Sequence, residues 1–280
     1  MPAHVVYIVL LAALMNAGWN AIVKSGGDKL LTVAMVTSAA AAIAALLLPF
    51  LRPPAAASWP FIAASVSLQL LYYGLLAAAY RRADMSHAYP LMRGTAPLIV
   101  AAVSAAVIGE IVSALQWLGI ALICGGVLGL AVHVPAQATR HRSATAFALA
   151  NAFVIASYTV IDGLGVRRSG SPPAYTLWIF LFTGIEMLLW ISIRRRREFL
   201  AYLHGRWLAG ALGGAGTVGS YVLALWAMTV APLALVAALR ETAILFATVI
   251  SALVLKERIT PQRLISTALI IAGAVALRFA

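Results

Sequence analysis

The segment YPLMRGTAPLIVAAVSAAVIGE, residues 89–110, places an arginine inside a long apolar run, and a related segment occurs again later in the chain. At an offset of 147 residues, residues 75–130 align without a gap with residues 222–277. The matched polar residues are Arg93 with Arg240, Thr95 with Thr242, Ser104 with Ser251, and Glu110 with Glu257. An arginine is costly inside an apolar segment, so its repetition at the matching position indicates that the chain consists of two related halves.

The composition is that of a membrane protein. Of the 280 residues, 63% are hydrophobic and 10% are charged, whereas a soluble domain carries about 25% charged residues. Apolar runs of about 20 residues follow one another, each long enough to cross roughly 30 Å of hydrocarbon. The runs lack the alternation of barrel strands, which leaves helices as the spanning elements. The sequence therefore predicts an all-α polytopic membrane protein without a soluble domain.

Basic and Gly/Pro-rich breaks separate the apolar runs. They predict ten transmembrane helices, at 4–23, 30–50, 59–80, 87–108, 113–133, 144–165, 174–193, 207–230, 232–254 and 260–279. The first helix has no basic region before it and no small-residue cleavage site after it, so we do not expect it to be a cleaved signal peptide.

The repeat divides the predicted helices into two sets of five. We expect a first repeat at 1–133, a linker at 134–143 and a second repeat at 144–280. Because five is an odd number, the two repeats insert with opposite orientations, as in secondary transporters that have a binding site near the membrane midplane. Such a chain is complete in itself, so we expect it to function as a monomer in the lipid bilayer, with a central cavity.

The formal net charge of +12 would suggest a nucleic-acid partner in a soluble protein, but here it fits basic loops at one membrane face. Most Lys and Arg residues follow odd-numbered helices, which predicts that both termini lie outside the cytoplasm. The single cysteine, Cys124, lies in an apolar run, and no two histidines have metal-ligand spacing. We therefore expect no nucleic-acid partner, no metal and no cofactor.

Two segments near the ends of the repeats resemble a known family. GEIVSALQWLGIALICGGVLGL (109–130) and KERITPQRLISTALIIAGAVAL (256–277) are similar to the two signature segments of EamA-type transporters, in the drug/metabolite transporter superfamily. NAGWNAIVK (16–24) and YPLMRG (89–94) resemble segments of one branch of that family, for which the amino-acid exporters are our candidate. The resemblance implies ten helices around a central cavity and alternating access, in a multi-pass protein of the bacterial inner-membrane type. Members of the superfamily are commonly drawn with both termini inside, so the resemblance and the charge pattern indicate opposite orientations.

The two arginines are the first candidates for substrate binding. Arg93 and Arg240 can each face the cavity and meet a substrate carboxylate, or each can reach the headgroups or hold two helices together. Tyr89 lies one helical turn before Arg93, on the same face. Glu241 has no matching carboxylate in the first half and can be the counter-ion of either arginine or a proton-coupling group. Because Glu241 adjoins Arg240 in sequence, we expect it to neutralise Arg240 and leave Arg93 for the substrate.

Other polar and aromatic residues form stripes on predicted helices. They can line a cavity, join helices by hydrogen bonds or, for Trp and Tyr, lie at the membrane interface. The further candidates for substrate binding are His87, Tyr73, Gln69, Asn16, Trp19, Tyr158, Trp178 and Tyr221. Glu110 and Glu257 lie at tight hairpins, where a carboxylate accepts hydrogen bonds from free helix N–H groups, so we expect structural roles for both. The Gly125-xxx-Gly129 pair suggests a close helix approach.

These observations favour a secondary transporter, and no enzyme activity is expected. The substrate predicted from the arginines, the aromatics and the resemblance is a small amphipathic metabolite for export, most simply an amino acid, aromatic ones included. Drugs and phosphorylated metabolites remain alternatives for the same fold. A channel or an intramembrane enzyme is a different class of alternative, but no serine–histidine or paired-aspartate site is apparent for an enzyme.

Overall fold

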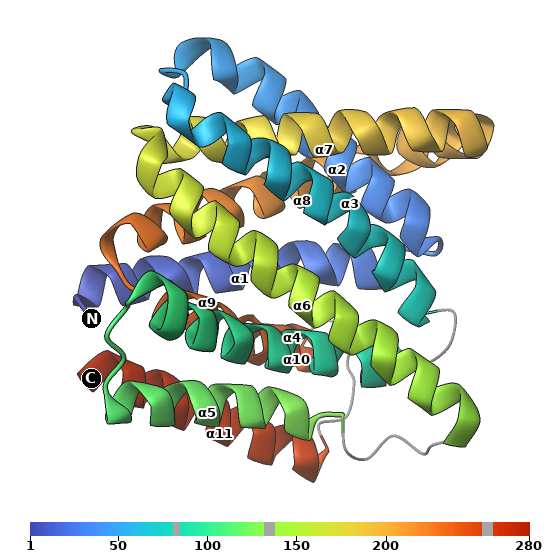
Figure 1. Ribbon diagram of the computed structural model, residues 1–280. Helices are drawn as coiled ribbons and strands as arrows, with labels where there is room; N and C mark the ends of the chain where they lie inside the picture. The colour runs from blue at the N-terminus through green and yellow to red at the C-terminus, as the bar shows by residue number, and fades with distance from the viewer. Residues whose placement is uncertain (81–84, 132–137, 254–259) are drawn as a thin grey trace.

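The computed structural model describes residues 1–280 except 81–84, 132–137 and 254–259, and it describes no side chains within 77–87 or 132–142. The described residues form helices and connections, with no strand among them (Figure 1). The longer helices are α1 (Ala3–Ser25), α2 (Lys29–Leu47), α3 (Trp59–Tyr80), α4 (Met85–Val103), α5 (Ala114–Gly129), α6 (Ala138–Ser169), α7 (Pro172–Arg194), α8 (Arg196–Val230), α9 (Leu233–Arg240), α10 (Ala243–Leu253) and α11 (Pro261–Phe279). Each predicted span overlaps at least one of them.

Eight stretches of the described chain are long and apolar enough to cross a membrane. One of these stretches, Pro172–Val230, contains both α7 and α8, and α5 is a shorter apolar helix outside the eight. The prediction of a polytopic all-α membrane protein is therefore confirmed, whereas the number of ten spans stays a prediction.

Three predicted boundaries differ from the structure. Helix α6 begins at Ala138, so residues 138–143 of the predicted linker are helical. Helix α8 begins eleven residues before the predicted position 207, and its backbone kinks at Arg206. The predicted helix 232–254 is interrupted after Arg240, which separates α9 from α10. Apolar length locates a span well, but it does not fix the ends of the helix, because polar segments such as 138–143 and 196–205 are helical too.

Helices at equivalent positions of the two repeats pack against each other. Helix α5 packs against α11, and the two run in opposite directions, as expected for an inverted repeat (Figure 1). Both termini lie on one side of the bundle, where Arg278 Nη1 donates to the Met1 carbonyl oxygen at 3.3 Å. An even number of membrane crossings places both termini on the same side of the membrane, whichever side that is.

Glycines allow the close contact between α5 and α11. A Cβ atom on Gly126 would lie 2.8 Å from the Ser266 carbonyl oxygen, and one on Gly273 would lie 2.6 Å from that of Gly119. Gly126 and Gly273 are matched by the repeat, so each half contributes a glycine to the same interface. Of the Gly125-xxx-Gly129 pair, for which we expected a close helix approach, a Cβ on Gly125 would have no atom within 4 Å, whereas one on Gly129 would lie 3.4 Å from Ser266 Oγ.

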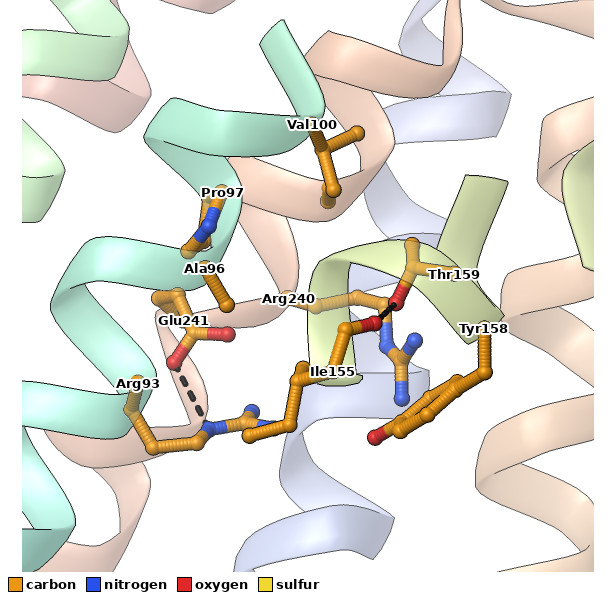
Figure 2. Close-up of a pocket in the computed structure, with 10 residues that line it drawn as sticks. Arg93, Ala96, Pro97, Val100, Ile155, Tyr158, Thr159, Arg240 and Glu241 are labelled. Atoms are coloured by element: carbon orange, nitrogen blue, oxygen red, sulfur yellow. Dashed lines mark hydrogen bonds and ion pairs between the residues drawn. The ribbon is translucent and has the colours of Figure 1, made fainter. Parts of the chain in front are cut away.

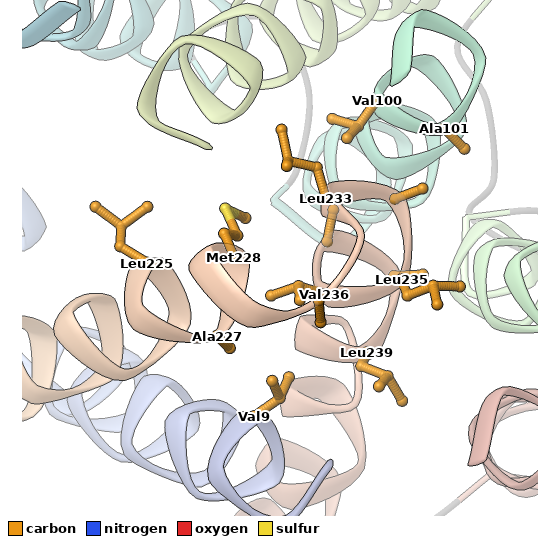
Figure 3. Close-up of a cluster of buried hydrophobic side chains, with 14 of the residues drawn as sticks. Val9, Val100, Ala101, Leu225, Ala227, Met228, Leu233, Leu235, Val236 and Leu239 are labelled. Carbon is orange, nitrogen blue, oxygen red and sulfur yellow. The ribbon is translucent and has the colours of Figure 1, made fainter. Parts of the chain in front are cut away.

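The main hydrophobic core surrounds α9, as Figure 3 shows. All apolar residues of α9 are buried, and Leu233, Val236 and Leu239 are among those with no exposed surface. Side chains from α1, α4 and α8 close around them, including Val9, Val100 and Met228. This packing fixes the end of α9, where two of the predicted site residues lie.

Candidate functional site

The interruption between α9 and α10 positions two charged residues inside the bundle. Arg240 is in the last turn of α9, and Glu241 is the residue that follows, with Thr242 completing a turn before α10. The last carbonyl groups of a helix have no intrahelical donor and carry partial negative charge, which favours a cation in the last turn. An interrupted helix near the midplane is the type of element that forms binding sites in inverted-repeat transporters.

Glu241 forms an ion pair with Arg93 of the other repeat. The Arg93 Nε and Glu241 Oε2 atoms are 2.9 Å apart, and the two side chains are 15% and 5% exposed (Figure 2). These two atoms make no well-aligned hydrogen bond, so the contact is mainly one of opposite charges. Our expectation that Glu241 would pair with Arg240 is therefore wrong, and the role of Arg93 in substrate binding stays a prediction. Neighbouring residues of a helix point in different directions, so adjacency in sequence does not pair them.

Arg240 instead lies over an aromatic ring. Its guanidinium carbon is 5.1 Å from the ring centroid of Tyr221 in α8, a cation–π geometry. Among the described residues, Arg240 has no ion-pair partner within 4.0 Å. Of the two arginines matched by the repeat, Arg240 is thus the one without a direct contact to a described carboxylate.

A buried hydroxyl network connects Tyr221 to Asp162 in α6. The Tyr221 hydroxyl donates to Asp162 Oδ2 at 2.5 Å, and the Tyr175 hydroxyl donates to Oδ1 at 3.1 Å. Ser65 of α3 lies near this carboxylate, and Gln69 Nε2 lies 3.2 Å from the Ser65 hydroxyl. Because Asp162 is fully buried, these donors replace the water that it loses on burial.

A pocket lies beside the two arginines and encloses about 290 Å³ of empty space, open solvent included. Only about 20 Å³ of it is open to the centre of a water-sized sphere, which is room for about one water, so in this conformation the pocket is narrower than a small-molecule site. Helices α4, α6 and α9 line the pocket, with Glu241 following α9. Figure 2 shows Arg93, Arg240, Glu241 and Tyr158 around it. The pocket lies between the two repeats, where alternating movement of the repeats would change access to it.

The structure places several predicted residues close to this pocket. Tyr158 lines it, and Tyr89 and Tyr158 are both close enough to Arg93 to interact with its charge. Tyr73 is farther away and makes an edge-to-face contact with Tyr72, whose ring also contacts Tyr158. Together these tyrosines form an aromatic wall that extends from the pocket to α3.

Other predicted residues lie outside the pocket lining. Asn16 accepts two hydrogen bonds from Asn20 within α1. Trp19 packs against Gly216 of α8, and its buried Nε1 atom has no hydrogen-bond partner in the part of the chain that the structure describes. Trp178 packs on Trp59 and Phe182 in α3 and α7. His87 is in the first turn of α4, in the part of the chain whose side chains are not described.

Glu110 joins the two repeats at the terminal side of the bundle. Its carboxylate accepts from the Leu233 backbone N–H at 3.0 Å, at the start of α9, and from Arg167 Nη2 at 2.8 Å. Arg167 also donates to the Met228 and Ala231 carbonyl oxygens. The carboxylate thus contacts a free helix N-terminus, although in the opposite repeat rather than in its own hairpin. Glu257 lies outside the described residues.

The pocket contains residues that sequence reasoning did not single out. These are Ala96, Pro97, Val100, Ile155, Thr159 and Ala237. All are common in membrane helices, so no local signal distinguishes them. Asp162 lies four residues after Tyr158, on the same side of α6, but no local signal indicated its contact with Tyr221. No group of three or more His, Cys, Asp or Glu residues able to hold a metal occurs within the described chain.

Comparisons with known proteins agree with this architecture. The model of the EamA-like transporter family matches residues 4–132 and again residues 142–279. The chain belongs to the EamA-like transporter family. This family member is therefore a multi-pass membrane transporter of the drug/metabolite transporter superfamily, built from two repeats.

A crystal structure of another protein has a similar fold, with a TM-score of 0.76 and 20% sequence identity over 100% of this chain and 98% of that chain. At that identity the similarity supports the fold alone. No curated protein matches the chain significantly. The substrate must therefore be inferred from the pocket of this EamA-like transporter.

Proposed function

We propose that this EamA-like transporter exports small amphipathic metabolites that carry a carboxylate, most simply amino acids with bulky apolar side chains. The observation that supports this proposal is the unequal pairing of the two arginines. Arg93 has Glu241 as a counter-ion, whereas Arg240 has an aromatic contact and no carboxylate within 4.0 Å among the described residues. Arg240 is thus the cation available to an anionic substrate group.

The chemistry of the pocket suits such a ligand. The planar guanidinium of arginine presents two parallel donors to a carboxylate, which lysine cannot do. Tyr158 and the apolar residues Ile155 and Val100 line the same pocket and can contact an apolar side chain. The substrate ammonium group of an amino acid would favour the aromatic faces or Glu241. We infer that the substrate carboxylate binds Arg240.

Alternating access follows from the position of the pocket between the repeats. The Arg93–Glu241 pair joins α4 of one repeat to the α9–α10 junction of the other. A substrate that changes the charge balance near this pair would alter how tightly the repeats are held together. Export as the direction rests on the family resemblance, and a bacterial inner membrane is the proposed location.

Transport by purified protein in liposomes tests the proposal. We expect labelled phenylalanine, tyrosine or leucine to accumulate saturably, with stimulation by unlabelled substrate on the other side. Arg240→Ala should abolish this exchange, whereas Arg52→Ala, which removes an exposed loop charge, should leave it unchanged. Exchange of phosphorylated metabolites or cationic drugs instead of amino acids would contradict the substrate class. Flux without saturation or trans-stimulation would contradict a carrier.

A further inference from the structure

The connection between α7 and α8 forms a short helix of its own at the end of the bundle opposite the termini. Helix α7 ends at Arg194, the backbone bends at Arg195 (φ −145°, ψ 39°), and a second bend follows at Arg206 (φ −139°, ψ 21°). The helical residues between the two bends, 196–205, are here called the junction helix. The spanning part of α8 begins only after the second bend, so the junction helix lies where the chain leaves the apolar spans.

One face of the junction helix is fixed to the bundle. Phe199 is 3% exposed and packs with Leu31 and Met35 of α2 and with Ile191 of α7. The Tyr202 and Thr32 hydroxyls form a hydrogen bond of 2.7 Å. At the first bend, Arg195 Nη1 lies 2.7 Å from Asp28 Oδ2, and Arg195 also contacts Glu198. The helix is therefore a fixed element and presents its other faces to the surroundings.

Those other faces combine positive charge with large apolar side chains. Arg194, Arg196 and Arg197 are exposed, and none of them has an ion pair with a described residue. The carboxylates of Asp28 and Glu198 are both engaged by Arg195. Exposed apolar residues lie beside these arginines, namely Ile193 at 82%, Leu200 at 52% and Trp207 at 65% exposed.

We propose that the junction helix and the flanking residues Ile193, Arg194 and Trp207 form a surface that binds the phosphate-bearing headgroups of anionic membrane lipids. Basic side chains near exposed Trp and Leu residues are typical of helices at the headgroup level of a bilayer. Here α7 and α8 span the membrane on either side, so the segment is held at that level. Lipid phosphates supply the negative charge that Arg194, Arg196 and Arg197 do not receive from any described carboxylate.

A soluble acidic protein would match the charges but would leave Ile193, Leu200 and Trp207 in water. Anionic lipid accounts for both features, because its headgroup meets the arginines while its acyl chains cover the apolar side chains. The charge pattern along the sequence predicts that this end of the bundle faces the cytoplasm. The cytoplasmic leaflet carries anionic lipid, which agrees with the proposed partner.

Native mass spectrometry and thermal unfolding of the full chain test this surface. We expect the parent protein to retain phosphatidylglycerol in preference to phosphatidylcholine and to unfold at higher temperature when phosphatidylglycerol is added. The variant Arg194→Gln/Arg196→Gln/Arg197→Gln should bind phosphatidylglycerol about fivefold more weakly for each arginine removed. The charge-preserving Lys variant at the same positions should keep most of the binding, which separates loss of charge from loss of fold.

A matched control removes the same charge from the terminal side of the bundle, as Arg52→Gln/Arg168→Gln/Arg278→Gln. This control should keep the phosphatidylglycerol preference of the parent. The proposal would be overturned if both triple variants lost phosphatidylglycerol binding equally. It would also be overturned if the variant at Arg194, Arg196 and Arg197 bound phosphatidylglycerol as strongly as the parent. Displacement of the lipid by soluble glycerol phosphate at matched concentration would also overturn it, because the surface would then recognise a free phosphate. Binding is the readout, so the outcome does not depend on the substrate that is transported.

Discussion

Arg93 and Glu241 meet at 2.9 Å between Nε and Oε2, although one belongs to α4 in the first repeat and the other follows α9 in the second. The repeat aligns Glu241 with Gly94, so the carboxylate has no counterpart in the first half. The pair thus breaks the symmetry of the two halves at the pocket, and it leaves Arg93 and Arg240 in different electrostatic environments.

Removing one partner of this pair should destabilise the protein. We expect Arg93→Gln or Glu241→Gln alone to lower the free energy of unfolding by about 3–5 kcal/mol, because a buried charge loses its counter-ion. The double variant should lose less than the sum of the two single variants. Unfolding in detergent, followed by circular dichroism, measures these values. Strictly additive losses would show that the two charges do not interact.

Lysine substitution should distinguish the two arginines. Arg240→Lys should weaken substrate affinity at least tenfold, because lysine cannot form the bidentate contact with a carboxylate. Arg93→Lys should weaken it less, since a lysine can still neutralise Glu241. Equilibrium binding of labelled substrate to purified protein gives both values, with Arg52→Lys as the control. Stronger loss in Arg93→Lys than in Arg240→Lys would assign the substrate to Arg93.

Tyr221 has two separable roles, one in its ring and one in its hydroxyl. Tyr221→Phe keeps the ring beneath Arg240 but removes a donor to Asp162, and we expect it to cost about 1–3 kcal/mol of stability. Tyr221→Leu removes both and should also weaken substrate affinity, because Arg240 loses its aromatic contact. Tyr175→Phe is the matched control, since it removes the other tyrosine donor without a contact to Arg240. Equal affinity in Tyr221→Phe and Tyr221→Leu would exclude a role for the ring.

The glycines between α5 and α11 should tolerate no side chain. Gly126→Ala and Gly273→Ala would each bring a Cβ within 3 Å of a backbone carbonyl oxygen, which cannot move like a side chain. We expect a loss of about 1–3 kcal/mol for each variant, measured by thermal unfolding in detergent. Gly125→Ala provides the comparison, because its Cβ would meet open space. A similar loss in Gly125→Ala would mean that helix packing is not the cause.

The Asp28–Arg195 contact outside the membrane should make stability depend on acid pH. Partial burial acts to raise the pKa of Asp28, but hydrogen bonds from the Leu31 N–H and from Arg195 outweigh it, so the pKa lies below its usual value. A lowered pKa in the folded state means that the stabilisation is present above the unfolded-state pKa and is lost as pH falls through the folded-state pKa.

The effect of this contact should be small, because exposed ion pairs are screened by water. Unfolding temperatures of the parent and of Asp28→Asn should differ most near neutral pH and converge on acidification to about pH 3. A difference that stays constant over this range would rule out ionisation of Asp28 as its source. High salt should reduce the difference at neutral pH.

The membrane class, the positions of most spans and the presence of two repeats follow from the amino-acid sequence alone. Apolar length decides where a helix can cross a bilayer, because unpaired backbone groups are not tolerated in hydrocarbon. Local hydrogen bonds also followed from the sequence. Ser113 and Thr260 were expected to begin helices, and their side chains accept from the backbone N–H groups of Gln116 and Arg263.

Which charges pair depends instead on how the helices pack in three dimensions. Arg240 and Glu241 are neighbours in sequence, yet Glu241 contacts Arg93 and Arg240 contacts Tyr221. The same holds for Gly126, which approaches α11 while its neighbour Gly125 does not. Partners across helices depend on helix rotation and on where a helix is interrupted, and both are set by the packing of the whole bundle. Apolar side chains of similar size fit many rotations, so the local sequence leaves these choices open.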